Sequence, residues 1–172
     1  MLYLLDASVL ITANNSYYPV DRVPEYWDWL RHMGQNGHVK IPIEIFEEIK
    51  EGPKDLEKDL LFAWFQEDAN KKALVLEEEV DLVSVQTVVS KGYAPDLSDD
   101  EVEYIGRDPF LVAYALAHPK NRYVVTVEVS KPSKKRQKRQ LPDVCKDLGV
   151  LSCDPFAFAK NLGFSTKWNN LF

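Results

Sequence analysis

The sequence contains few of the features that mark a secreted, disulfide-bonded or membrane protein. Its two cysteines, Cys145 and Cys153, are too few for a disulfide framework, and their spacing does not match a zinc site. No apolar run approaches the roughly 18 residues needed to cross a bilayer. The N-terminal segment has no basic region and its apolar stretch is broken by Asp6, so we expect no signal peptide. These absences predict a cytoplasmic protein with two buried or half-buried thiols and no membrane partner.

Length and composition favour one globular domain. The chain has 172 residues, of which 45% are hydrophobic and 28% are charged, and that balance is typical of folded rather than disordered chains. A chain of this size buries a sizeable core without disulfides or structural metals. Because no repeat or linker-like segment interrupts it, we predict a single domain over residues 1–172.

The charge is unevenly distributed. The net charge of −6 argues at first against a nucleic-acid partner, but residues 130–140 hold six of the 21 basic residues and no acid. Without them the chain carries 15 basic and 27 acidic residues, a net charge of −12. Such a segment suits RNA phosphates, and a solvated loop that only raises solubility is an equal alternative. The predicted RNA-binding residues are Lys131, Lys134, Lys135, Arg136, Lys138 and Arg139.

Short apolar runs alternate with amphipathic segments along the chain. This alternation predicts a three-layer α/β/α fold with a central, mostly parallel sheet. Residues 80–90 suit either a helix or an extended segment, and we expect a loop over residues 92–100. We predict strands at Leu2–Leu5, Val39–Ile41, Tyr123–Thr126 and Val150–Leu151, and helices at Asp21–Gly37, Ile43–Glu51, Leu56–Asn70, Pro109–His118 and Pro155–Leu162.

Two acids follow strong predicted strands. Asp6 comes directly after Leu2–Leu5, and Glu128 comes two residues after Thr126. Ligand sites of open parallel sheets lie at the carboxyl ends of the strands. If both strands are central and parallel, the two carboxylates therefore lie at the same edge of the sheet.

Two further acids begin or flank predicted helices. In Ile43–Glu51, Glu48 lies nearest the apolar face, whereas Glu44, Glu47 and Glu51 point further toward water. A boundary glutamate whose stem packs and whose carboxylate reaches water is the alternative interpretation. Asp108 precedes Pro109 and a helix that is apolar on nearly every side, so it suits an N-cap, a ligand or both.

If these four acids converge in the fold, they favour binding of a divalent cation. Four carboxylates in apolar surroundings repel one another and raise their own pKa values, and a bound divalent cation removes that penalty. Oxygen ligands favour Mg²⁺ or Mn²⁺ over zinc. Such ions activate water and stabilise the charge that builds on a phosphodiester. The set therefore predicts phosphodiester hydrolysis, with Asp6, Glu48, Asp108 and Glu128 as the catalytic and metal-binding acids.

These residues resemble the PIN-domain family, in a PIN-like branch related to VapC-type toxins. The resemblance covers most of the chain, and it depends on the order and spacing of motifs that are individually unspecific. The motifs are Leu-Leu-Asp-Ala-x-Val-Leu-Ile at Leu4–Ile11, then Tyr17-Tyr18-Pro19, Trp27–Leu30, Ile41-Pro42 with Glu48-Ile49, Asp108–Ala113, Val125–Glu128 and Leu141–Cys145.

The resemblance implies a metal-dependent ribonuclease with three or four acids, in which Asp6, Glu48 and Asp108 are the first three. Glu128 occupies the place of the fourth, where the family often has Asp, and Asp143 is a second candidate for that ligand. Ser8 and Thr126 are implied as supporting residues. The family also implies RNA as substrate.

The same resemblance leaves the partner proteins open. It allows a toxin held by a protein antitoxin, and it allows a homodimer. We interpret the aromatic residues Trp27 and Trp29 as exposed and available for a dimer contact, although core packing explains at least one of them.

Other functions remain alternatives. One is a PIN-like fold without activity that binds RNA or protein, which only the Glu at position 128 favours. A phosphatase of the aspartyl-nucleophile type would need a second acid after Asp6-Ala7, where Ser8 stands instead. Dinucleotide binding lacks its glycine motif. The three histidines lie in surface or helix-end contexts, so we predict no catalytic role for His32, His38 and His118.

Overall fold

The centre of the protein is a four-stranded, entirely parallel sheet. A computed structural model describes residues 1–51 and 59–170 and gives the strand order β2-β1-β3-β4. The central pair is in register from Leu2 opposite Arg122 to Leu5 opposite Val125. The strands are β1 (Leu2–Leu5), β2 (Val39–Lys40), β3 (Arg122–Val125) and β4 (Leu151–Cys153). The two strands predicted to be central and parallel therefore pair directly with each other.

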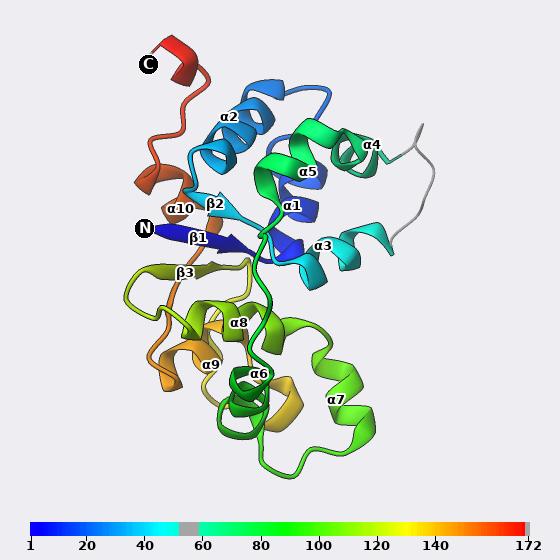
Figure 1. Ribbon diagram of the computed structural model, residues 1–172, viewed down its shortest axis with the longest axis vertical. Coiled ribbons are helices and arrows are strands. Elements are labelled where there is room, and N and C mark those ends of the chain that lie inside the picture. The colour runs from blue at the N-terminus through cyan, green and yellow to red at the C-terminus, as the bar shows by residue number, and fades with distance from the viewer. Residues whose placement is uncertain (52–58, 171–172) are drawn as a thin grey trace.

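Helices cover both faces of this sheet. Figure 1 shows α2, α4 and α5 on one side of the sheet and α6, α7, α8 and α9 on the other. The predicted three-layer α/β/α architecture is thereby confirmed. The helices are α1 (Ala7–Thr12), α2 (Pro24–Gln35), α3 (Ile43–Lys50), α4 (Leu60–Gln66), α5 (Asp68–Leu74), α6 (Leu82–Thr87), α7 (Asp99–Ile105), α8 (Asp108–Leu116), α9 (Leu141–Asp147) and α10 (Pro155–Asn161).

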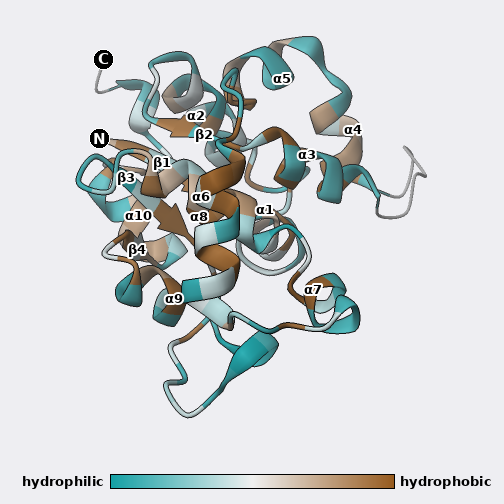
Figure 2. Cartoon of the chain, turned by 60° about the horizontal axis from the view of Figure 1, so that its bottom comes forward, coloured by the Kyte–Doolittle hydropathy of each residue, from teal (hydrophilic) through white to brown (hydrophobic). Residues whose placement is uncertain are grey.

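The apolar helix α8 and the strands form the middle of the core. Leu111, Val112 and Ala115 of α8 are fully or almost fully buried, as are Leu4 and Leu5 of β1. In Figure 2 the hydrophobic residues gather in the strands and along α8, while hydrophilic residues cover the outer helices. This burial explains why the sequence of α8 is apolar on nearly every side.

Aromatic side chains attach α2 to the remainder of the molecule. Trp27 and Trp29 are both buried, at 1% and 0% exposure. Trp29 packs against Phe158 of α10 and against Phe164, with ring centroids 5.5 and 5.0 Å apart. The interpretation of these tryptophans as exposed dimer contacts was wrong, because Trp29 is covered by α10 and the C-terminal segment, and Trp27 packs against Trp64 of α4.

The helix predicted over Leu56–Asn70 is two helices, α4 and α5. The chain is extended at Glu67, with ψ 123°. The buried Asn70 side chain donates to the carbonyl oxygen of Trp64 at 2.8 Å, which satisfies a helix-end acceptor where the first helix stops. The predicted start at Leu56 and the predicted stop of the preceding helix at Gly52-Pro53 lie outside the described residues.

The region predicted as a loop over residues 92–100 contains helical structure at both ends. Helix α6 continues into the π-helix η2 (Val88–Tyr93), and α7 starts at Asp99. A capping box explains that start, because the Ser98 hydroxyl accepts from the amide of Glu101 while the Glu101 carboxylate accepts from the amide of Ser98. The helical alternative for residues 80–90 is therefore confirmed, and the loop prediction was too long.

In the part of the chain that the structure describes, every helix is too short or too polar to span a bilayer.

Candidate functional site

Asp6 lies at the carboxyl end of β1, between the sheet and the start of α1. Its side chain does not cap α1, although Asp6 is the N-cap residue. Instead its Oδ2 atom accepts hydrogen bonds from the hydroxyl of Ser8 and, at 3.0 Å, from the hydroxyl of Thr126. Burial raises the pKa of Asp6 more than these hydrogen bonds lower it. The two residues predicted to support the site thus hold the first acid in place.

Glu128 lies beside Asp6 because β3 pairs with β1. The amide of Glu128 donates to the Thr126 hydroxyl at 3.2 Å, and that hydroxyl donates in turn to Asp6. The carboxylate of Glu128 accepts from the amide of Leu141, at the start of α9, at 2.6 Å. Burial is the main cause of a raised pKa at Glu128, and the negative charge of Asp6 adds to it.

Helix α8 begins at Asp108, one residue before the predicted start at Pro109. Arg107 is the N-cap, so Asp108 is the first helical residue and makes no capping hydrogen bond. The hydroxyl of Tyr93 instead lies 3.4 Å from its Oδ2 atom. Burial raises the pKa of Asp108 to about 8, and the charges of Asp6, Glu128 and Glu48 contribute. The N-cap interpretation was wrong, because the carboxylate faces the other acids rather than its own helix.

Glu48 differs from its predicted environment. It is an exposed residue, whereas Glu44 and Glu47 of the same helix are half-buried. The reason is that α8 covers the flank of α3 on which Glu44 lies: the Tyr114 hydroxyl is 3.5 Å from the Glu44 carboxylate. Partial desolvation and the charge of Asp6 nevertheless raise the pKa of Glu48. Glu48 is therefore a solvent-facing acid at the edge of the group.

The four predicted acids are electrostatically linked at one edge of the sheet. Asp6 contributes to the raised pKa of each of the other three. As they stand, however, no three His, Cys, Asp or Glu side chains of residues 1–51 and 59–170 are placed to hold one metal ion. Asp6 and Glu128 each use an oxygen to accept a hydrogen bond from a protein donor. Their role as metal ligands stays a prediction.

The donor chemistry of the group fits a hard cation. Cys145 lies close enough to Asp108 and Glu128 for their charges to act on it, but burial first of all raises the pKa of its thiol to about 12. This thiol is one soft donor beside four carboxylates. Oxygen donors remain, and these suit Mg²⁺ or Mn²⁺.

Asp143 accepts hydrogen bonds from the loop that follows Glu128. It lies on α9, and its two oxygens accept from the Ser130 hydroxyl at 2.5 Å and from the Lys131 amide at 2.7 Å. Burial alone would raise its pKa, but these hydrogen bonds and nearby positive charges bring the pKa below its usual value. Since both oxygens are engaged, the geometry favours Glu128 over Asp143 as the fourth acid of the group.

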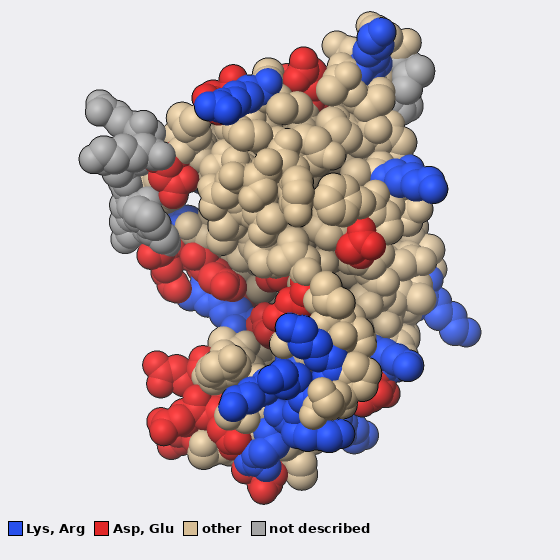
Figure 3. Space-filling model, turned by 180° about the vertical axis from the view of Figure 1, so that it is seen from behind, with Lys and Arg blue, Asp and Glu red and all other residues tan. Residues whose placement is uncertain are grey.

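The basic segment is an ordered loop with two kinds of basic residue. Arg136 binds Glu101 of α7 at 2.6 Å and Asp96 at 2.8 Å, and Arg139 binds Asp147 at 2.5 Å. These arginines are half-buried and act within the protein. Figure 3 shows basic side chains gathered on the lower part of one face, next to acidic ones. The lysines that remain exposed are Lys131, Lys134, Lys135 and Lys138.

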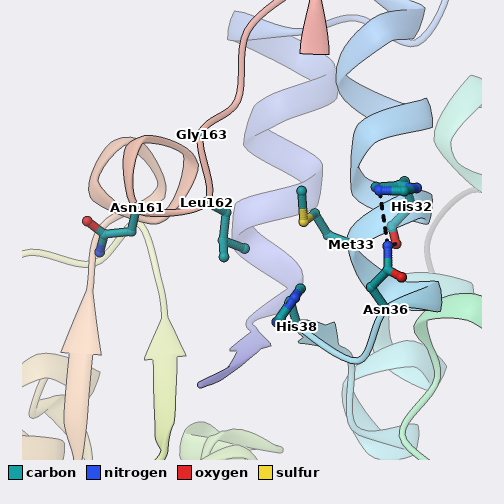
Figure 4. A pocket seen from close by; sticks show the side chains of 7 residues that line it. All are labelled: His32, Met33, Asn36, His38, Asn161, Leu162 and Gly163. Atoms are coloured by element: carbon teal, nitrogen blue, oxygen red, sulfur yellow. Dashed lines mark hydrogen bonds between the residues drawn. The ribbon is translucent and has the colours of Figure 1, made fainter. Parts of the chain in front are cut away.

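The histidines lie away from the acids, at the amino ends of the strands. His32 and His38 line a cavity of about 690 Å³ between the end of α2 and the end of α10, together with Asn36 and Asn161 (Figure 4). His38 and His118 border a neighbouring cavity at Met1 and Arg122. The strand edge that gathers the acids therefore contains no histidine among the described residues, and the absence of a catalytic histidine stays a prediction.

The sequence analysis did not identify Ser98, Glu101 or Tyr93, three residues near the site. The Ser98-x-x-Glu101 capping pattern would have revealed α7, which anchors Arg136. No sequence signal indicates Tyr93, since its contact with Asp108 depends on how η2 packs against α8.

The fold and site together define an α/β/α protein with an acidic group at the carboxyl edge of a parallel sheet. Residues 3–166 match the family described as domain of unknown function DUF4411, so the chain belongs to that family. Comparisons with curated proteins and with solved structures found no match.

Proposed function

We propose that this protein is a metal-dependent endoribonuclease of the PIN type. The supporting observation is that four acids from four separate chain segments act on one another electrostatically at the carboxyl edge of the sheet. Asp6, Glu48, Asp108 and Glu128 would hold Mg²⁺ or Mn²⁺. A bound ion of this kind supplies charge neutralisation and a water of lowered pKa.

The chain's own residues have separable roles in this proposal. Ser8 and Thr126 fix the carboxylate of Asp6, so this acid is already oriented before any ligand binds. Glu48 is exposed and long, which leaves it free to change rotamer toward the other acids. The Lys131 charge acts on Glu128, so the lysine-bearing loop starts beside the acids and can bind RNA phosphates there.

The wider biological role is part of the same proposal. A cytoplasmic ribonuclease of this kind would suit the toxin of a toxin–antitoxin pair, and an acidic antitoxin segment would compete with RNA for the exposed lysines. Electrostatic competition of that kind weakens with salt.

A second candidate is a PIN-like module that binds RNA without cleaving it. The observation that favours it is that Glu128 already accepts from the Leu141 amide, and that no three of the described acids are placed to share an ion. Calorimetry with Mn²⁺ separates the two candidates: binding below millimolar concentration supports the nuclease, and its absence supports the module.

The decisive experiment is RNA cleavage by Asp6→Asn and Asp108→Asn. We expect wild-type protein to cut single-stranded RNA with Mn²⁺ or Mg²⁺ and to stop when the metal is chelated. Each variant should lose cleavage while keeping the wild-type circular dichroism spectrum. Asp28→Asn is the matched control, because Asp28 is an exposed acid paired with Arg31 on α2. Cleavage by either site variant at the wild-type rate would refute the proposed site.

A further inference from the structure

A small pocket lies between α3 and α8, the two helices that carry Glu48 and Asp108. It has a volume of about 240 Å³. This is below the roughly 300–1,000 Å³ of pockets for drug-sized ligands, and it suits a single planar fragment. Glu44 precedes Glu48 by one turn, about 6 Å along the helix axis, and Arg107 directly precedes Asp108. The lining residues are Ile43, Glu44, Glu47, Arg107 and Phe110.

The walls of this pocket suit a nucleobase. Ile43 is 41% exposed and Phe110 is half-buried, so both offer apolar surface to a ligand. The Arg107 guanidinium is held in place, because it donates to the carbonyl oxygen of Glu44 at 2.6 Å and to the carboxylate of Glu51. Aromatic rings and fixed guanidinium planes are the surfaces on which single-stranded RNA bases stack.

Glu44 adds a hydrogen-bond acceptor that has no donor. Its Oε2 atom is buried and accepts no hydrogen bond from any described residue. Its neighbour Glu47 pairs with Lys50 at 2.9 Å, and Glu51 pairs with Arg107. An ionised carboxylate only accepts, and a buried acceptor without a donor is unfavourable. The terminal torsion of a glutamate is soft, so rotation of the carboxylate can present Oε2 to a ligand in the pocket.

We propose that this pocket binds one RNA base beside the acidic group and selects guanine. Guanine is the RNA base whose Watson–Crick edge presents two adjacent N–H donors, N1–H and the N2 amino group, to a single carboxylate. Adenine and cytosine offer one amino group next to an acceptor, which the carboxylate would repel. This inference deepens the proposed function and rests on it for its biological meaning, but the pocket can be tested separately.

The first test measures nucleoside binding to the metal-free protein. We expect guanosine to bind about 10-fold or more tightly than adenosine, cytidine or uridine, a discrimination typical of a bidentate pair. Glu44→Gln should remove this preference, because the amide replaces one acceptor by a donor. Glu103→Gln, an exposed acid of α7, should retain it. Equal binding of the four nucleosides, no guanosine binding, or an unchanged preference in Glu44→Gln would each overturn the inference.

A second variant guards against misfolding of Glu44→Gln. Ile43→Ala changes an exposed wall of the pocket without altering the carboxylate. We expect it to weaken guanosine binding while keeping guanosine preferred over the other three nucleosides. A loss of the preference in Ile43→Ala would contradict the role given to Glu44.

Cleavage mapping distinguishes the failure of this inference from the failure of the proposed function. Wild-type protein with Mn²⁺ should cut a mixed-sequence RNA next to guanine, and Glu44→Gln should spread the cuts over other bases. Cleavage without base preference in both proteins would overturn the guanine pocket and leave the nuclease standing. Guanosine selectivity that depends on Glu44 in a protein that cuts no RNA would overturn the nuclease and leave the pocket standing.

Discussion

Two aspartates near the site, half-buried Asp108 and buried Asp143, have opposite environments. Asp108 lies among other acids, and its pKa is raised to about 8, first by burial and then by their charges. Asp143 accepts two hydrogen bonds from the loop, and its pKa falls below the usual value. One carboxylate is destabilised in its ionised form and the other is stabilised, so the same substitution should have opposite effects at the two positions.

We predict that Asp108→Asn stabilises the metal-free protein at alkaline pH. The folded pKa of Asp108 exceeds its unfolded value, so its contribution to stability is complete below about pH 4 and is lost as the pH rises through about 8. Removing the ionisable group removes that loss. Thermal unfolding at pH 6 and pH 9 in the presence of a chelator should show a smaller pH dependence than in the wild type.

Asp143→Asn should instead destabilise the protein at neutral pH. A lowered folded pKa gives stability that is present above the unfolded pKa and lost as the pH falls through the folded one. The substitution leaves fewer acceptors for Ser130 and the Lys131 amide, and it should cost about 1–3 kcal/mol of unfolding free energy at pH 7. Stabilisation by this variant at pH 7 would contradict the structural role.

At the residue scale the sequence predicted where the acids lie in the fold better than how their side chains face. The positions of Asp6 and Glu128 could be predicted from the ends of their strands, because the pairing of two parallel strands fixes both positions. Glu48 was placed toward the buried side, since its own helix was the only guide. Helical periodicity gives a residue's direction relative to the apolar face of its own helix, but it does not reveal which neighbouring element covers that face.

At the scale of elements, the basic loop is positioned by α7. Arg136 is the one described residue other than glycine with a positive φ, 54°, and it forms ion pairs with Glu101 and Asp96. The sequence predicted the charge of the loop, but it could not separate arginines that bind the protein from lysines that face solvent. That separation depends on α7, a helix that the sequence analysis did not predict and whose first two residues it placed in a loop.

The exposed lysines should account for the salt dependence of RNA binding. We predict that Lys134→Ala lowers the slope of log affinity against log salt concentration by about 0.7 for single-stranded RNA, as expected when one phosphate contact is lost. Titrations of wild-type protein in a chelator measure this without cleavage. Lys160→Ala on α10 is the control, because Lys160 is an exposed lysine of another element. An identical slope for Lys134→Ala and wild type would remove the loop from the RNA interface.

At the scale of the whole molecule, the acidic group is a source of instability in the metal-free protein. The four acids come from the residue after β1, from α3, from α8 and from the segment after β3, so their repulsion acts between elements that the fold must bring together. A cation that binds only the folded state would stabilise all of these elements at once.

We therefore predict that Mn²⁺ raises the unfolding temperature. At 100 times the dissociation constant, a single bound ion contributes about 2.7 kcal/mol, which corresponds to a shift of about 5–10 °C for a domain of this size. Differential scanning calorimetry with and without a chelator measures the shift. Asp6→Asn should reduce it strongly, while Asp28→Asn should leave it unchanged. An equal shift in Asp6→Asn would show that the metal binds elsewhere.

The outer strands of the sheet limit how copies of this chain can associate. The edge strands β2 and β4 have only two and three residues. So short an edge offers few unpaired amide and carbonyl groups for another strand to join, which protects against edge-to-edge aggregation. Any self-association of the protein would therefore use helix surfaces rather than a continuous sheet across two copies.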